Sequence, residues 1–227
     1  MSKGTITALL KNVPLFEDFS EEELDSIAPL FHERTYKKGA FLFFEGDVGN
    51  EFYLIESGFV KISKLEDEKE ITLALFRDGD FFGEMALVQK GFTRSATAET
   101  LERSKIYKLN RNDFHEFMLS SPKLCLNLLE VSMGRLRKAN EQIHDLTFLD
   151  VRSRILKNIH RLSEDYGKPV QGGLLIDLKL THQQLANIVG TVRETVTKVL
   201  QELQDRKVIV IENKRIIVTN LEKLKQY

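Results

Sequence analysis

The feature that most constrains the fold of this chain is a run of apolar and small residues between positions 122 and 149. These residues recur at alternating spacings of four and three, at Cys125, Leu129, Ser132, Leu136, Ala139, Ile143 and Leu146. The resulting 3.5-residue period predicts one long helix with a seam along one side. The seam can pack on the helix's own domain or on a second copy of the chain. The sustained period favours a two-stranded coiled coil in a homodimer.

The chain before this helix has a different texture, because short apolar stretches alternate there with glycines. Four of these stretches have the composition of strands, at residues 52–55, 60–62, 71–76 and 106–109. The Asp78-Gly79 pair between two of them is typical of a turn. Regular short strands separated by Gly and Asp turns predict a β sandwich or barrel.

A short helix is predicted ahead of the strands, over residues 20–32. Ser20 and Glu23 have the spacing of a capping box, which satisfies free amides at a helix start. Leu24 and Ile27 follow at helical spacing. This helix is therefore expected to be amphipathic.

After the long helix the pattern stays helical from Asp150 to about Tyr166, and the Gly-rich stretch 167–173 is expected to be a loop. Thr181 and Gln184 then form a second capping-box pattern. A helix of about two turns, a tight turn at Gly190 and a longer helix capped by Thr191 follow, which is the pattern of a helix-turn-helix. Strands at 207–211 and 215–218 complete it as a small hairpin, the wing.

Four residues near the start of the second helix share its outward face: Arg193, Glu194, Thr197 and Lys198. This part of a recognition helix enters the DNA major groove. Arginine can bond guanine O6 and N7, glutamate can accept from cytosine N4, and lysine can reach guanine or phosphate. We also expect DNA contacts from Thr181 and Gln183, at the start of the first helix, and from Lys214 at the wing tip. The alternative is that this motif is only a packed helical hairpin.

The distribution of charge supports a polyanion partner at one end of the chain. Residues 1–121 carry 15 Lys and Arg against 22 Asp and Glu, a net of −7, whereas residues 178–227 carry 9 against 5, a net of +4. The overall net charge of −1 hides this asymmetry. A basic tail fits DNA binding, although a solvated surface can have the same balance.

Several classes of protein are disfavoured by composition. The single cysteine, Cys125, rules out an internal disulfide and a Cys-based zinc or iron–sulfur site, and it fits the reducing cytoplasm. No signal-peptide pattern or apolar run long enough to span a membrane is present. The five histidines are scattered singly, and no nucleophile–base pair, metal cluster or Walker loop indicates an enzyme or a metal site.

The densest motif before the long helix is Gly83-Glu84-Met85, followed eleven residues after Gly83 by Arg94-Ser95. Amides at a helical turn together with an arginine suit a phosphate. A carboxylate beside them suits a sugar hydroxyl that donates a hydrogen bond. The pattern therefore indicates a nucleotide sugar-phosphate, whereas a simple Glu84–Arg94 ion pair is the alternative.

These motifs resemble the cyclic AMP receptor protein branch of the CRP/FNR regulators over nearly the whole chain. The segment around Gly83-Glu84 with Arg94-Ser95 is similar to the phosphate-binding cassette of that family, Leu149-Asp150-Val151 to its interdomain join, and Arg193-Glu194-Thr195-Val196 to its recognition helix. The resemblance implies an α+β fold in three parts: a cyclic-nucleotide-binding-type jelly roll at 1–121, a dimerisation helix at 122–149 and a winged helix-turn-helix at 150–227.

The resemblance also implies function. It indicates a homodimeric transcription regulator that reads an inverted-repeat operator, contacts RNA polymerase through a surface such as 167–173, and is gated by cyclic AMP or a related nucleotide. Where cyclic AMP-responding members carry Thr-Ser on the dimer helix, this chain has Ala139-Asn140. Asn140 can still bond a base, but Ala139 cannot replace a hydroxyl. A regulator of the same family without an effector is therefore the alternative.

Overall fold

The computed structural model of the chain describes residues 3–88, 91 and 93–225. The chain divides into two compact bodies, residues 1–137 and 138–227. The long helix α5 (Pro122–Phe148) contains this boundary, so its first four turns belong to one body and its last three to the other. The predicted helix is thus confirmed.

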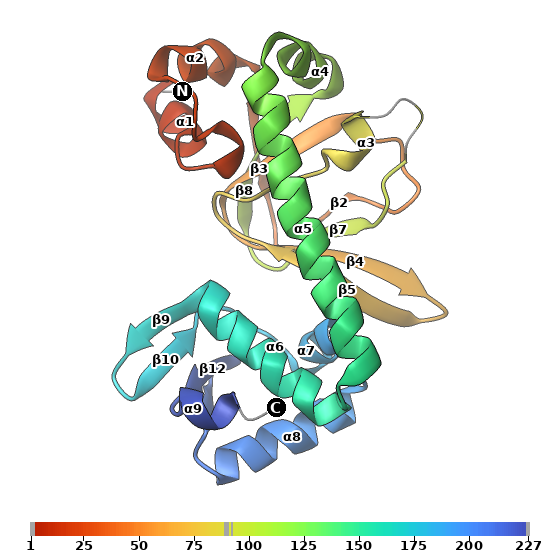
Figure 1. The fold of residues 1–227 in the computed structure, drawn as a ribbon, viewed down its shortest axis with the longest axis vertical. Coiled ribbons are helices and arrows are strands. Elements are labelled where there is room, and N and C mark those ends of the chain that lie inside the picture. The colour runs from red at the N-terminus through yellow and green to blue at the C-terminus, as the bar shows by residue number, and fades with distance from the viewer. Residues whose placement is uncertain (1–2, 89–90, 92, 226–227) are drawn as a thin grey trace. The chain divides into compact units, whose positions relative to one another are not determined.

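The first body contains two four-stranded antiparallel sheets, which confirm the predicted jelly roll. One sheet has the order β1-β8-β3-β6, with β1 at His32–Tyr36, β8 at Ser104–Asn110, β3 at Glu51–Ser57 and β6 at Phe81–Phe82. The other has the order β2-β7-β4-β5, with β2 at Phe41–Phe43, β7 at Thr97–Thr100, β4 at Val60–Glu66 and β5 at Lys69–Phe76. Figure 1 shows β4 and β5 as a long twisted hairpin.

Helices pack on the sheets at one end of this body. They are α1 (Lys3–Leu10), α2 (Glu21–Ile27), α4 (Arg111–Ser120) and the first turns of α5, and Figure 1 shows them gathered together. Phe16, Phe52, Phe114 and Leu124 are buried in the shared core. The short helix α3 (Met85–Val88) follows β6.

The capping box at Ser20 and Glu23 is confirmed, but the helix it opens is shorter than predicted. The α-helix ends at Ile27, a 3₁₀ turn occupies Ala28–Leu30, and His32 already begins β1. Pro29 has no amide hydrogen to continue the α-helical ladder, which explains the early end.

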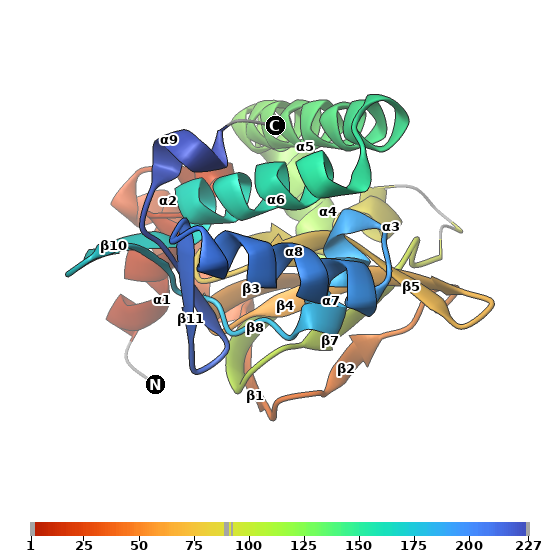
Figure 2. The same ribbon diagram turned by 90° about the horizontal axis from the view of Figure 1, so that it is seen from below.

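The second body is a winged helix built on α6 (Val151–Tyr166), α7 (His182–Val189) and α8 (Arg193–Asp205). Figure 2 shows α7 and α8 side by side. The wing strands are β11 (Ile209–Glu212) and β12 (Arg215–Val218), and α9 (Leu221–Leu224) follows them. Asn213 and Lys214 turn the wing in the left-handed region, with φ of 50° and 64°.

Residues 167–173 are not a loop, and this prediction was wrong. They contain β9 (Gly167–Val170) and begin β10 (Gly173–Ile176), which pair with each other, and β10 also pairs with β12. The glycines that suggested a loop allow the hairpin instead. At Gly173 an added Cβ would lie 2.2 Å from the Val218 carbonyl oxygen of the neighbouring strand.

Candidate functional site

The cassette turn in the first body depends on Gly83. Its φ is +88°, and an added Cβ would lie 2.8 Å from Nη1 of Arg94 and 3.0 Å from the carbonyl oxygen of Glu51. A side chain here would be strained in its backbone and would collide with the arginine. Gly83 therefore lets β6 turn into α3 while the Arg94 side chain lies directly beneath the backbone.

Arg94 is buried, with 4% of its surface exposed. Its Nη1 donates to the carbonyl oxygen of Gly83 at 2.9 Å and its Nη2 to that of Glu51 at 2.7 Å. The guanidinium lies over the rings of Phe43 and Tyr53, at 4.2 and 5.4 Å from their centroids. Burial lowers the pKa of Arg94, while nearby acidic groups oppose this change. Its Nε is buried without a hydrogen-bond partner among the described residues.

Glu84 is also buried, and its partner is not Arg94. One carboxylate oxygen accepts from Nη1 of Arg135 at 2.9 Å, and Nη2 of Arg135 donates to the Phe81 carbonyl oxygen at 2.5 Å. The other oxygen, Oε2, has no partner among the residues described. Sequence reasoning missed Arg135, whose signal was its place next to the seam residue Leu136 on α5.

The remaining predicted effector residues are exposed. Met85 and Ser95 lie beside each other, with Ser95 Oγ 3.9 Å from Met85 Sδ. Asn140 lies on the part of α5 that belongs to the second body, and its side chain is exposed. The structure thus brings Gly83, Glu84 and Arg94 together with Met85 and Ser95 in one cassette.

The helix-turn-helix of the second body is held by its caps and its turn. Thr181 caps α7, and both bonds of the predicted capping box with Gln184 are present. Gly190 adopts the left-handed conformation, with φ of +71°, and ends α7. Thr191 does not cap α8 as predicted, because the residue before this helix is Val192, which makes no side-chain cap bond.

The predicted DNA-contact residues are all exposed, and four of them share the start of α8. Arg193, Glu194, Thr197 and Lys198 project from the first two turns of α8, and Lys214 is exposed at the wing tip. Gln183 is exposed but donates to Asn187 at 2.8 Å, and the Thr181 hydroxyl accepts from the Gln184 amide. This surface can present a fork of donors, a carboxylate and amines to base edges.

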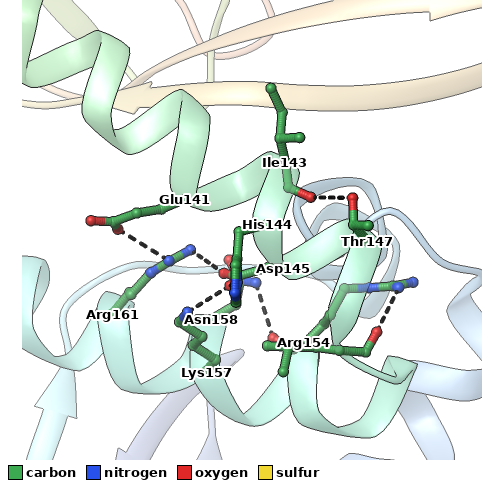
Figure 3. A network of polar contacts seen from close by, with 10 residues as sticks. Glu141, Ile143, His144, Asp145, Thr147, Arg154, Lys157, Asn158 and Arg161 are labelled. Atoms are coloured by element: carbon green, nitrogen blue, oxygen red, sulfur yellow. Dashed lines mark hydrogen bonds and ion pairs between the residues drawn. The ribbon is translucent and has the colours of Figure 1, made fainter.

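A buried carboxylate fastens the last turns of α5 to α6. Asp145 is 3% exposed and forms ion pairs with Lys157 at 2.5 Å and Arg161 at 2.9 Å (Figure 3). Arg161 also reaches Glu141, one turn earlier on α5. These three contacts make the end of α5 a structural part of the DNA-binding body.

Metal and membrane features are absent from the part of the chain that the structure describes. No group of three His, Cys, Asp or Glu residues there could hold a metal ion. Over the same residues, no helix is long and apolar enough to cross a membrane.

A jelly roll joined to a winged helix-turn-helix defines a class of DNA-binding transcription regulators. Two family models match the corresponding regions: a cyclic nucleotide-binding domain at residues 33–121 and a Crp-like helix-turn-helix domain at 153–227.

Relatives cover most of the chain. It is 33% identical to the cyclic AMP receptor protein of Thermus thermophilus, over 88% of the chain and 89% of that protein. It is 32% identical to the global nitrogen regulator of Synechococcus elongatus, over 84% and 87%. A solved structure of a CRP/FNR family regulator from Thermus thermophilus superposes with a TM-score of 0.71 at 30% identity, covering 86% of this chain and 97% of that one. The chain belongs to the CRP/FNR family of DNA-binding transcription regulators.

Proposed function

We propose that this chain acts as a homodimer whose affinity for an inverted-repeat DNA site is controlled by cyclic AMP or a related nucleotide. The nucleotide-binding part of this proposal is supported by two buried polar atoms in the cassette. Glu84 Oε2 can accept a hydrogen bond and Arg94 Nε can donate one, and neither has a partner among the described residues. A ribose hydroxyl and a cyclic phosphate supply the matching donor and acceptor.

The effector would bind against the jelly roll, beneath the side of α5 that carries Arg135. Gly83 and Met85 would line the cassette, and Ser95, exposed beside it, would bond the phosphate. Asn140 is proposed as the contact to the base, as the resemblance implies. Because Ala139 offers no hydroxyl, the base contact is expected to differ from that of Thr-Ser members.

The dimer is proposed to form along α5. In one subunit, the seam side chains Leu129, Leu136 and Ile143 are 53%, 53% and 62% exposed. A second copy of α5 would cover them in a coiled coil. An effector that favours one arrangement of the two recognition helices would raise DNA affinity, since half-sites lie about 34 Å apart.

On DNA, Arg193 and Lys198 are proposed to read guanine or contact phosphate and Glu194 to read cytosine, with Thr197 beside them. Thr181, Gln183 and Lys214 are proposed as flanking contacts. The β9–β10 hairpin is the proposed contact to RNA polymerase, in the cytoplasm.

To test base reading, duplexes selected from a random pool would be bound to the Lys198→Ala variant, whose affinity is expected to fall. Unchanged affinity would contradict that role.

A second candidate is a regulator of the same family that uses no effector. It is favoured by the two terminal nitrogens of Arg94, which already bond backbone carbonyls. In that case wild-type protein and the Arg94→Ala variant would bind DNA equally without any nucleotide.

Calorimetric titration with cyclic AMP tests the cassette, with cyclic GMP and AMP as controls. Saturable binding of cyclic AMP that is lost in Arg94→Ala and weakened in Glu84→Gln would support it. Absence of heat at about millimolar nucleotide, where binding free energies are about 4 kcal/mol, would contradict a nucleotide effector.

A further inference from the structure

One of the five scattered histidines, His182, lies beside the proposed DNA-contact residues of α8. His182 is the first residue of α7, and its Nδ1 lies 2.8 Å from Oγ1 of Thr197 on α8. Thr197 Oγ1 also donates to the carbonyl oxygen of Arg193, at 2.9 Å. The imidazole therefore bonds directly to one of the residues expected to face the major groove.

The single proton of the Thr197 hydroxyl determines which atom donates and which accepts in this contact. A threonine hydroxyl has one proton. Thr197 Oγ1 lies 2.9 Å from the Arg193 carbonyl oxygen, and a carbonyl oxygen can only accept. The hydroxyl proton is therefore used in the bond to Arg193. The hydroxyl can then only accept from His182, so Nδ1 carries a hydrogen. In the neutral ring Nε2 has a lone pair, whereas in the protonated ring Nε2 becomes a donor.

The position of His182 suits a backbone phosphate. It begins the first helix of the helix-turn-helix, and that helix crosses the DNA backbone in proteins of this architecture. Among the described residues no partner is recorded for its Nε2, which leaves this atom available on a partly exposed side chain. A protonated Nε2 can donate to a phosphate oxygen, but a neutral one would meet it with a lone pair.

The charged groups around His182 are mostly cations. Helix α7 itself (HQQLANIV) contains no Asp, Glu, Lys or Arg. Arg193, Glu194 and Lys198 lie within about one turn of Thr197 on α8. Lys179 precedes α7, and Lys214 is close by, because its carbonyl accepts from the Leu180 amide at 3.1 Å. From α6, Arg154 reaches Gly190 at the far end of α7. This mostly basic surface suits the negative charge of a DNA backbone.

We propose that His182 is a DNA-contact residue that makes DNA binding proton-linked. Its Nδ1–H holds the Thr197 hydroxyl in place, and its Nε2 takes up a proton as DNA binds and donates to a backbone phosphate. This rests on the proposed DNA-contact surface of α7 and α8. Affinity should rise as pH falls from 8 toward 6, through the range in which histidine titrates.

The proposal predicts a specific salt dependence. Each phosphate contact adds about −0.9 to the slope of log affinity against log salt concentration. The slope of the wild-type dimer should therefore be steeper by about 1 to 2 at pH 6 than at pH 8, one contact coming from each subunit.

The test uses the full chain and a duplex recovered from a random-sequence pool by the wild-type protein, with affinity measured by fluorescence anisotropy. His182→Asn is the informative variant, because an asparagine amide can donate to Thr197 as Nδ1 does but does not titrate. His182→Ala removes both roles, and His115→Asn, an exposed position on α4, is the matched control. Circular dichroism checks that each variant folds.

The expected result is that wild type and His115→Asn show the pH-dependent slope, whereas His182→Asn loses it and keeps the affinity that wild type has at pH 8. His182→Ala should bind more weakly at both pH values. A wild-type slope that is the same at both pH values, or a pH dependence that survives in His182→Asn, would overturn the inference while leaving DNA binding intact. If the wild-type protein enriched no duplex from the random-sequence pool, the proposed function would be overturned, and the inference with it.

Discussion

Arg94 is the residue on which both the fold and the proposed effector site depend. It donates to two partly buried carbonyl oxygens, and truncation would remove the donor of each, at a cost of about 1–3 kcal/mol. We therefore expect Arg94→Ala to lower the free energy of unfolding by about 2–4 kcal/mol in urea denaturation. Ser95→Ala, at an exposed position, is the control and should change it by less than about 0.5 kcal/mol. Equal stability of the two variants would show that these carbonyl contacts do not form.

Asp145 gives a second prediction for a single residue. Asp145→Asn would leave Lys157 and Arg161 without their shared buried anion. Loss of one partner of a buried ion pair is strongly destabilising, and partial exposure of the two cations reduces the cost to about 2 kcal/mol. Thermal unfolding should show this loss, whereas Glu141→Gln, whose side chain is 63% exposed, should change stability by less than about 1 kcal/mol. A stable Asp145→Asn variant would contradict the assigned role of this carboxylate.

For individual residues, the sequence predicted which side chains form the candidate site better than it predicted their hydrogen-bond partners. Glu84 and Arg94 stand out because a glycine turn and an arginine at that spacing suit a phosphate. Arg135 does not stand out, because its contact to Glu84 joins positions 51 residues apart. Local patterns carry no information about such a pairing. The same limit hid the contact between His182 and Thr197.

Among the elements, α5 carries a prediction about assembly. Leu136 is exposed in one subunit, so Leu136→Glu should leave the subunit folded but place a charge in the proposed seam. Sedimentation should then show a monomer, whereas Arg137→Glu, one residue off the seam, should stay dimeric. A Leu136→Glu dimer as stable as wild type would exclude this seam.

The contact between α6 and α8 predicts a dependence on pH. The bond from Arg152 is the main cause that lowers the pKa of Glu202 below its ordinary 4.5. A lowered folded-state pKa means that the stabilisation is present above the unfolded pKa and is lost as pH falls through the folded value. Glu202→Gln should be less stable than wild type at pH 7 by less than about 1 kcal/mol, because the pair is largely solvated. This difference should vanish well below pH 4.5, and a difference that persists there would contradict the ion pair.

Local signals predicted elements well where the interaction itself is local. Both capping boxes formed as expected, since each joins residues three apart. The β9–β10 hairpin was missed because its stability comes from pairing of β10 with β12, more than 40 residues later, as in Leu174 with Val218. Val192 and not Thr191 precedes α8, because the Thr191 amide still bonds the Ala186 carbonyl oxygen at the end of α7.

For the whole molecule, the proposed gating depends on α5, which contains the boundary between the two bodies. The predicted dimerisation segment 122–149 contains this boundary. Arg135 contacts the cassette residue Glu84 in one body, and Asp145 fastens α5 to α6 in the other. A single helix thus makes contacts within each body, and the proposed gating would act through it.

The most direct test of effector-gated DNA binding is the affinity of the wild-type protein for a selected duplex, measured with and without saturating cyclic AMP. Coupling free energies of 1–3 kcal/mol predict an affinity about 5- to 150-fold higher with the nucleotide. The Arg94→Ala variant should show no such increase. Equal affinity of the wild-type protein in both conditions would contradict gating by cyclic AMP.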